Sequence, residues 1–245
     1  MIEVERGAFT CCFGVTRTGK SLAARQIFMA HAWPRVAIDV KDEMADRLPG
    51  VPVVYEPAQI LDYPTCRAVP LEPGDEDWYD ELYSVAIASS SKDAGGYLVW
   101  LDEGNEPTHP GFIPRGARRF ILQGKGRGCG HIMCSPRPAS VHKTFESQAD
   151  HFFFFELQHP RDQHAVAELT GLHPDRVREA FDEIGSHRVS DIEPSHHYAY
   201  YRRGMRELVI CEPLEDPAIL TAQIATRTYP SWRDLGYESW ASPNR

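Results

Sequence analysis

The chain has 245 residues, of which 42% are hydrophobic and 25% charged, and its formal net charge is −9. This is the composition of a soluble globular protein, and the length suits a full α/β core. No apolar run approaches the roughly 20 residues that cross a bilayer and no secretory signal opens the sequence, so we expect no membrane span and a cytoplasmic location.

Strand and helix patterns alternate through the first half of the chain. The predicted elements are, in order, a strand at Ala8–Phe13, a helix at Lys20–His31, strands at Val36–Val40 and Val51–Tyr55, a helix at Asp75–Ser89 and a strand at Tyr97–Leu101. The strands are apolar or β-branched runs, and the helices have apolar residues at helical spacing.

The second half continues the pattern and ends in a hairpin. It predicts a proline-containing loop at Asn105–Pro114, a helix at Arg115–Gln123, strands at His131–Cys134 and His151–Leu157, helices at Arg161–Thr170 and Pro174–Ile184, and a hairpin of Tyr198–Tyr201 with Glu207–Cys211. Alternating strands and helices predict an α/β fold with a mostly parallel sheet covered by helices on both faces. Beyond Gly171 we expect a small C-terminal elaboration.

A glycine-rich loop joins the first predicted strand to the first predicted helix. It consists of Gly14, Val15, Thr16, Arg17, Thr18, Gly19, Lys20 and Ser21, and it matches G-x-x-x-x-G-K-[ST] at every fixed position. The backbone N–H groups of such a loop cradle phosphates, the lysine reaches the β- and γ-phosphates, and the serine hydroxyl holds Mg²⁺. The sequence therefore predicts a P-loop NTPase that binds ATP with Mg²⁺. Arg17 either contacts the nucleotide or a neighbouring subunit, or is simply solvated.

A pair of acidic residues follows the predicted strand Tyr97–Leu101. Asp102 at the end of a buried strand is placed to hold Mg²⁺ beside Ser21, as a Walker B aspartate does. Glu103 points differently because side chains alternate along a strand, and it could orient or deprotonate the attacking water. This pair favours an ATP-hydrolysing enzyme over a kinase.

The segment Gly124–Pro138 contains basic residues between glycines, a short apolar strand, and then Ser135 followed by Pro136, Arg137 and Pro138. With Walker motifs before it and the segment Ala149–Gly171 after it, the chain resembles the FtsK/HerA-like superfamily of DNA translocases, which includes viral genome-packaging ATPases. Similarity runs over roughly Phe9–Gly171. Within this segment Cys129, His131 and Cys134 could in principle approach one metal ion, although buried or solvent-facing thiols fit an apolar strand better.

The resemblance implies a RecA/FtsK/HerA-like fold and a homo-oligomeric ring, usually a hexamer, with ATP between neighbours and double-stranded DNA in the centre. It places Arg127 where such proteins offer an arginine to the neighbour's γ-phosphate. At the position where the family commonly senses that phosphate with glutamine, this chain has Ser135. A serine is shorter, so either a water bridges the gap or another group does the sensing.

Basic residues in an otherwise acidic chain are the candidates for DNA contact. They are Lys92, in the loop before the predicted strand Tyr97–Leu101, and Arg115, Arg118 and Arg119, in the helix after it. Contacts from such residues to phosphates would be independent of sequence and weakened by salt. An ordinary charged helix face is the competing interpretation. The turn Arg202-Arg203 and the nearby tyrosines Tyr198, Tyr200 and Tyr201 are weaker candidates.

We therefore expect an ATPase domain over residues 1–212, with its motifs in about 8–171, and an extension or tail over 213–245. The predicted function is a DNA-translocating ATPase, most simply a viral packaging motor acting at a capsid portal, with association with the virion as a further expectation. A filamentous-phage-type assembly ATPase is one alternative, although such proteins carry a membrane span. The other alternative is a nucleotide-dependent assembly or regulatory protein that does not move DNA.

Overall fold

The computed structural model describes residues 4–31, 34–91, 95–188, 190 and 192–215. Within these residues the chain forms one nine-stranded sheet in the order β3-β4-β2-β5-β6-β1-β7-β8-β9. The strands are β1 (Phe9–Phe13), β2 (Arg35–Ile38), β3 (Val53–Val54), β4 (Thr65–Ala68), β5 (Leu98–Leu101), β6 (Gly130–Ser135), β7 (His151–Phe154), β8 (Tyr198–Arg202) and β9 (Val209–Cys211). The α-helices are α1 (Lys20–Ala30), α2 (Glu76–Ala88), α3 (Arg115–Gln123), α4 (Lys143–Gln148), α5 (Pro160–Thr170) and α6 (Pro174–Ser186), and the short 3-10 helices are η1 (Pro57–Asp62), η2 (Lys125–Arg127) and η3 (Pro138–Ser140).

Counted across the sheet, the strands β3, β4, β2, β5, β6, β1 and β7 are parallel, and β8 and β9 extend the sheet antiparallel at one edge. Phe13 at the end of β1 pairs with Ser135, and Leu101 at the end of β5 pairs with Met133. The carboxyl ends of β1, β5 and β6 therefore lie side by side, and the loops that follow them meet at one edge of the sheet.

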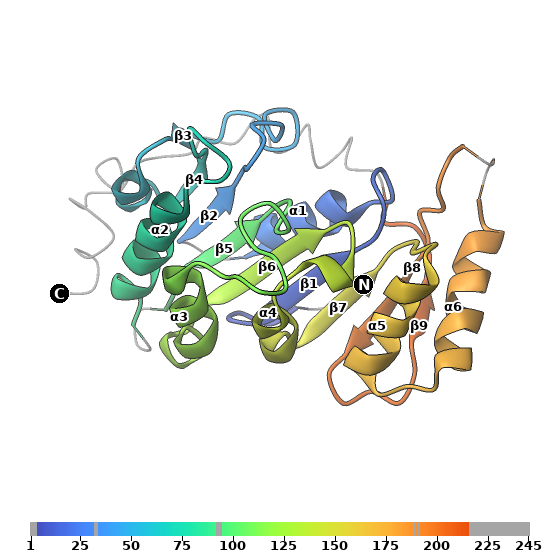
Figure 1. Cartoon of the computed structure of the whole chain (residues 1–245). Coiled ribbons are helices and arrows are strands. Elements are labelled where there is room, and N and C mark those ends of the chain that lie inside the picture. Colours follow the sequence, from blue (N-terminus) through green and yellow to red (C-terminus); the bar gives the residue numbers. More distant parts are fainter. Residues whose placement is uncertain (1–3, 32–33, 92–94, 189, 191, 216–245) are drawn as a thin grey trace.

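The two faces of the sheet are covered unequally (Figure 1). Phe9, Cys11 and Phe13 pack on one face into a core shared with α2 to α6, whereas Cys12 faces the other side and packs with α1. This division follows from the alternation of side chains along a strand. Helices on both faces were predicted and are found, but of the described helices only α1 covers the second face.

Most predicted elements are confirmed, with boundaries that shift by a few residues. Among the strands and α-helices, two were not predicted: β4, whose four residues include Arg67, and the six-residue helix α4. The predicted hairpin is confirmed as β8 and β9, which join the sheet that contains β1. The predicted tail falls largely outside the described residues.

Candidate nucleotide-binding site

The glycine-rich loop follows β1 and leads directly into α1. Two of its glycines have a backbone that other residues rarely adopt, with φ of 151° at Gly14 and 113° at Gly19. A Cβ atom at Gly14 would lie 2.5 Å from the Cβ atom of Phe155, so the loop packs directly against Phe155. Since Gly19 has no side chain to cap the helix, the N–H groups of the first turn of α1 are available to an anion.

Lys20 and Thr18 shape the interior of this loop. The Lys20 ammonium and the Thr18 hydroxyl each donate to the carbonyl oxygen of Val15, at 2.8 Å in both cases. Burial lowers the pKa of Lys20, and the nearby acidic groups Asp102 and Glu103 oppose that shift. The lysine is thus held over the loop, where its charge would meet a bound phosphate. Thr16 and Arg17 are exposed at the loop tip, and Arg17 has a left-handed φ of 67°.

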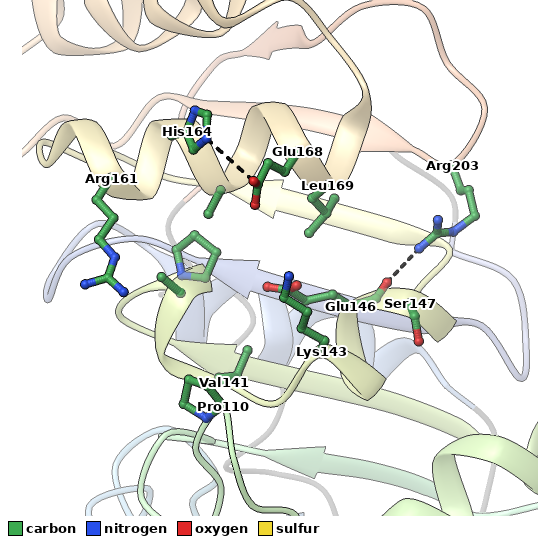
Figure 2. A pocket seen from close by; sticks show the side chains of 13 residues that line it. Pro110, Val141, Lys143, Glu146, Ser147, Arg161, His164, Glu168, Leu169 and Arg203 are labelled. Atoms are coloured by element: carbon green, nitrogen blue, oxygen red, sulfur yellow. Dashed lines mark hydrogen bonds and ion pairs between the residues drawn. The ribbon is translucent and has the colours of Figure 1, made fainter.

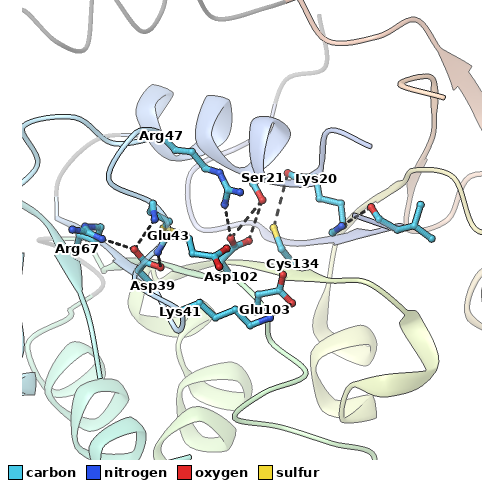
Figure 3. Close-up of polar contacts among 12 residues, drawn as sticks. Lys20, Ser21, Asp39, Lys41, Glu43, Arg47, Arg67, Asp102, Glu103 and Cys134 are labelled. Carbon is cyan, nitrogen blue, oxygen red and sulfur yellow. Dashed lines mark hydrogen bonds and ion pairs between the residues drawn. The ribbon is translucent and has the colours of Figure 1, made fainter. Parts of the chain in front are cut away.

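Asp102 lies beside Ser21, as the sequence predicted (Figure 3). The Ser21 hydroxyl donates to Asp102 Oδ1 at 3.3 Å. Burial raises the pKa of Asp102, while the guanidinium of Arg47 lowers it. A hydroxyl next to a buried carboxylate is a donor set that suits Mg²⁺, which takes few protein ligands and completes its shell with water and phosphate oxygens. Ser21 and Asp102 would hold the ion.

Glu103 is placed differently from Asp102, but not through the alternation of side chains along a strand that was predicted, because β5 ends at Leu101 and both acids lie in the turn that follows. It has a left-handed φ of 52°, and its side chain is 34% exposed. Its carboxylate lies 3.6 Å from the ammonium of Lys41, which also lies 3.6 Å from Glu106. Glu103 is therefore close to the candidate metal ligands but open to solvent, which suits a residue that orients water.

Two cations of this site were not predicted from the sequence. Lys41 and Arg47 both come from the segment after β2, and they contact the two acidic residues that follow β5. Arg47 donates to Asp102 Oδ2 at 3.0 Å. These contacts form because β2 pairs with β5, and no local sequence pattern indicates that pairing. The sequence signal that could have pointed to these cations is Asp39, an acidic residue that directly follows the apolar strand β2 and precedes both of them.

Arg127 lies at the opposite edge of the sheet from the glycine-rich loop, because it precedes β6 whereas the loop follows the parallel strand β1. It is half-buried, and its guanidinium donates to the carbonyl oxygens of Ile87 at 3.2 Å and Ser90 at 3.4 Å, at the end of α2. A five-residue strand is about 17 Å long. Arg127 is therefore too distant to act on a nucleotide held by its own subunit.

Ser135 ends β6 next to the end of β1, but its hydroxyl is engaged within the turn that follows. It is buried, and it donates to the Arg137 carbonyl at 3.2 Å and lies 3.1 Å from the Ser140 hydroxyl. Its predicted contact with nucleotide stays a prediction.

The predicted DNA-contacting arginines share one helix. Arg115, Arg118 and Arg119 are exposed on α3, which packs on α2 through its buried side. Lys92, the fourth candidate, lies outside the described residues. The arrangement presents three cations to solvent together, whether or not DNA is their partner.

The three residues considered for a structural metal are not grouped as ligands. His131 is buried, and its Nε2 lies 2.9 Å from the Tyr83 hydroxyl. Within the described part of the chain, no three His, Cys, Asp or Glu side chains are placed to hold an ion together. The contacts of His131 are those of a core histidine.

Two hollows differ in their relation to the loop. One, of about 270 Å³, adjoins the loop and is lined by Thr18, Gly19, Leu22, Phe155, His196, Pro213 and Leu214. The other, of about 460 Å³, lies between α4 and α5 (Figure 2). In the second hollow burial raises the pKa of Glu146 to about 7, with Lys143 opposing and Glu168 adding to the shift. Only the first is placed to receive part of a nucleotide bound at the loop.

At the sequence level the chain matches no protein-family profile and no curated protein. Solved structures do match. The genome packaging NTPase B204 from Sulfolobus turreted icosahedral virus 2, in complex with sulfate, aligns with a TM-score of 0.67 and 15% identity, over 87% of this chain and 100% of its own. The chain has the P-loop ATPase fold.

Two further matches are a conjugation coupling protein and VirB4. The pCW3 conjugation coupling protein TcpA with ATPγS aligns with a TM-score of 0.58 and 12% identity, over 91% of this chain and 66% of its own. VirB4 of Thermoanaerobacter pseudethanolicus aligns with a TM-score of 0.53 and 8% identity, over 87% and 91% of the two chains. The B204 protein has also been solved with ATPγS and with AMPPCP. Among the described residues of this chain, no helix is long and apolar enough to cross a membrane.

Proposed function

We propose that this chain binds ATP with Mg²⁺ at the Gly14–Ser21 loop and hydrolyses it to move double-stranded DNA, as the packaging motor of a virus. The observation that carries the nucleotide part is the contact between the Ser21 hydroxyl and Asp102, made by residues 81 positions apart. It unites the two motifs at one sheet edge. Lys20 would neutralise the phosphates, and the ion would polarise the phosphoryl group that is transferred.

Hydrolysis needs a group that orients water, and Glu103 is the residue we assign to it. Its carboxylate follows the metal-binding aspartate directly, and its partial exposure leaves it accessible to water. The base of the nucleotide would occupy the hollow lined by Leu22, Phe155 and His196, on the side of the loop away from Asp102. This assignment places phosphates, ion and water on one side and the base on the other.

Movement of DNA is supported by the resemblance of motifs and by the fold shared with B204, which is described as a genome packaging NTPase. In a head-to-tail ring, Arg127 would act on the nucleotide of the neighbouring subunit, because it lies at the far edge from its own loop. The exposed arginines of α3 would contact DNA phosphates. On this proposal the protein works in the host cytoplasm, at the portal vertex of a capsid, as a ring of six subunits.

The proposal is tested by measuring ATP hydrolysis with and without double-stranded DNA. We expect DNA to stimulate turnover, and we expect the triple variant Arg115→Ala, Arg118→Ala, Arg119→Ala to lose that stimulation while keeping basal hydrolysis. The matched control is Arg178→Ala, an exposed arginine on α6 that pairs with Asp175. Each lost phosphate contact should reduce the salt dependence of DNA binding, by about one in the logarithmic slope.

The same measurement separates the alternatives. An assembly or regulatory protein that does not move DNA would hydrolyse ATP at the same rate with and without DNA. If DNA stimulates the triple variant as strongly as the wild type, the DNA contact lies elsewhere, and Arg202 with Arg203 would be the next residues to change.

A further inference from the structure

The segment that follows β2 is fixed in place by a buried ion pair. Asp39 accepts hydrogen bonds from the backbone N–H groups of Glu43 at 2.9 Å and Met44 at 2.8 Å, and from the guanidinium of Arg67 at 2.5 Å. Met44 and Leu48 are buried in the core beneath α1. The backbone on either side of Arg47 is therefore anchored, and its side chain starts from a defined position.

From this anchored segment Arg47 reaches the candidate metal ligand (Figure 3). Its guanidinium lies 3.0 Å from Asp102 Oδ2, while the Ser21 hydroxyl lies 3.3 Å from Oδ1 of the same carboxylate. The buried Asp102 carboxylate thus pairs with a permanent cation, Arg47. It also accepts a hydrogen bond from the hydroxyl of Ser21, which would bind the divalent ion together with Asp102. Arginine stays charged at every physiological pH, so the guanidinium does not release this contact by losing a proton.

The exposure of Arg67, from β4, and of Arg47, from the segment after β2, indicates which of the two arginines can move. The side chain of Arg67 is 8% exposed, and withdrawing it would leave Asp39 buried without its cation. The side chain of Arg47 is 39% exposed, so it can exchange its carboxylate contact for water at little cost. Arg67 has the features of a fixed structural residue, and Arg47 those of a displaceable one.

We propose that Arg47 is a positioning residue that competes with the divalent ion for Asp102 and so sets the Mg²⁺ concentration at which nucleotide binds. The inference rests on the proposed function, because it requires that Ser21 and Asp102 hold the ion. Two cations on one carboxylate repel each other, and each weakens the binding of the other. The contact also keeps the Asp102 carboxylate paired and oriented until the ion displaces it.

The test is a titration of MgCl₂ into protein with a fluorescent, non-hydrolysable ATP analogue, with bound analogue as the readout. The variant Arg47→Gln removes the charge and leaves a shorter, uncharged polar side chain. We expect its half-saturating Mg²⁺ concentration to fall about tenfold, which corresponds to about 1.4 kcal/mol. Arg47→Lys keeps the charge and should stay within about threefold of the wild type. Arg178→Ala is the control for loss of an exposed arginine.

Each outcome decides between distinct accounts. An unchanged or raised half-saturating Mg²⁺ concentration in Arg47→Gln would overturn the competition. So would loss of analogue binding at saturating Mg²⁺, which would show instead that Arg47 contacts the nucleotide. If wild type itself does not bind the analogue at any Mg²⁺ concentration, the proposed function fails rather than this inference. A thermal melt of each variant establishes that the folded protein is being compared.

Discussion

Replacing Gly14 by alanine should disrupt the phosphate loop more than its single added methyl group suggests. The new Cβ would lie 2.5 Å from Phe155 Cβ, and the backbone φ of 151° disfavours any side chain. Overpacking of this kind costs about 1–3 kcal/mol, and a backbone that only glycine readily adopts costs about 1–3 kcal/mol more. The melting temperature should therefore fall by roughly 4–24 °C, at about 2–4 °C for each kcal/mol in a chain of this size.

The matched control for this change is Gly126→Ala. A Cβ at Gly126 would meet no atom within 4 Å, so the same substitution there should shift the melting temperature by about 2 °C or less. Differential scanning calorimetry measures both variants, and binding of an ATP analogue reports on the loop itself. If Gly14→Ala melts like the control and binds the analogue like the wild type, the described packing of the loop on Phe155 is wrong.

Three further predictions address the site and its surroundings. Lys20→Ala should lose most ATP binding, measured by calorimetric titration; binding equal to wild type would remove Lys20 from the phosphate site. Arg127→Ala should bind ATP yet turn over slowly, and mixing it with Lys20→Ala subunits should restore part of the activity if the arginine acts across an interface; no recovery, despite demonstrated subunit exchange, argues against that. Glu146 has a pKa raised from its ordinary 4.5 to about 7, so it binds more protons folded than unfolded, and the free energy of unfolding should fall as pH rises between those values. Glu146→Gln should remove that fall and stabilise the protein at pH 8 by about 1–3 kcal/mol, measured by urea unfolding; parallel pH profiles for the two proteins would contradict the assignment.

The elements that were predicted well are those whose signal is local. The loop, α1 and the acids after β5 are each specified by a short run of residues, and Ser21 and Asp102 were expected to meet because both motifs end strands of one parallel sheet. Strand β4 was missed because four residues with an arginine among them do not form an apolar run. The structure shows why the arginine is tolerated there: Arg67 is paired with Asp39.

The cations around Asp102 and Glu103 were missed for a different reason. Lys41 and Arg47 reach those acids only because β2 lies between β4 and β5, and strand order is a property of the whole fold. Arg127 shows the converse. Its position in the chain suggested a loop open to a neighbour, but its contacts with the end of α2 follow from packing that the sequence does not display.

The most direct test of the central claim is the ATPase rate of Glu103→Gln beside that of wild type, each with and without double-stranded DNA. The substitution keeps the size of the side chain and its hydrogen-bonding capacity but removes the carboxylate that would orient water. We predict that wild type hydrolyses ATP and is stimulated by DNA. The variant should bind ATP with Mg²⁺ as tightly as wild type and should hydrolyse it at least about a hundredfold more slowly in both conditions. Hydrolysis by Glu103→Gln at the wild-type rate, or wild-type protein that binds no ATP, would contradict the account.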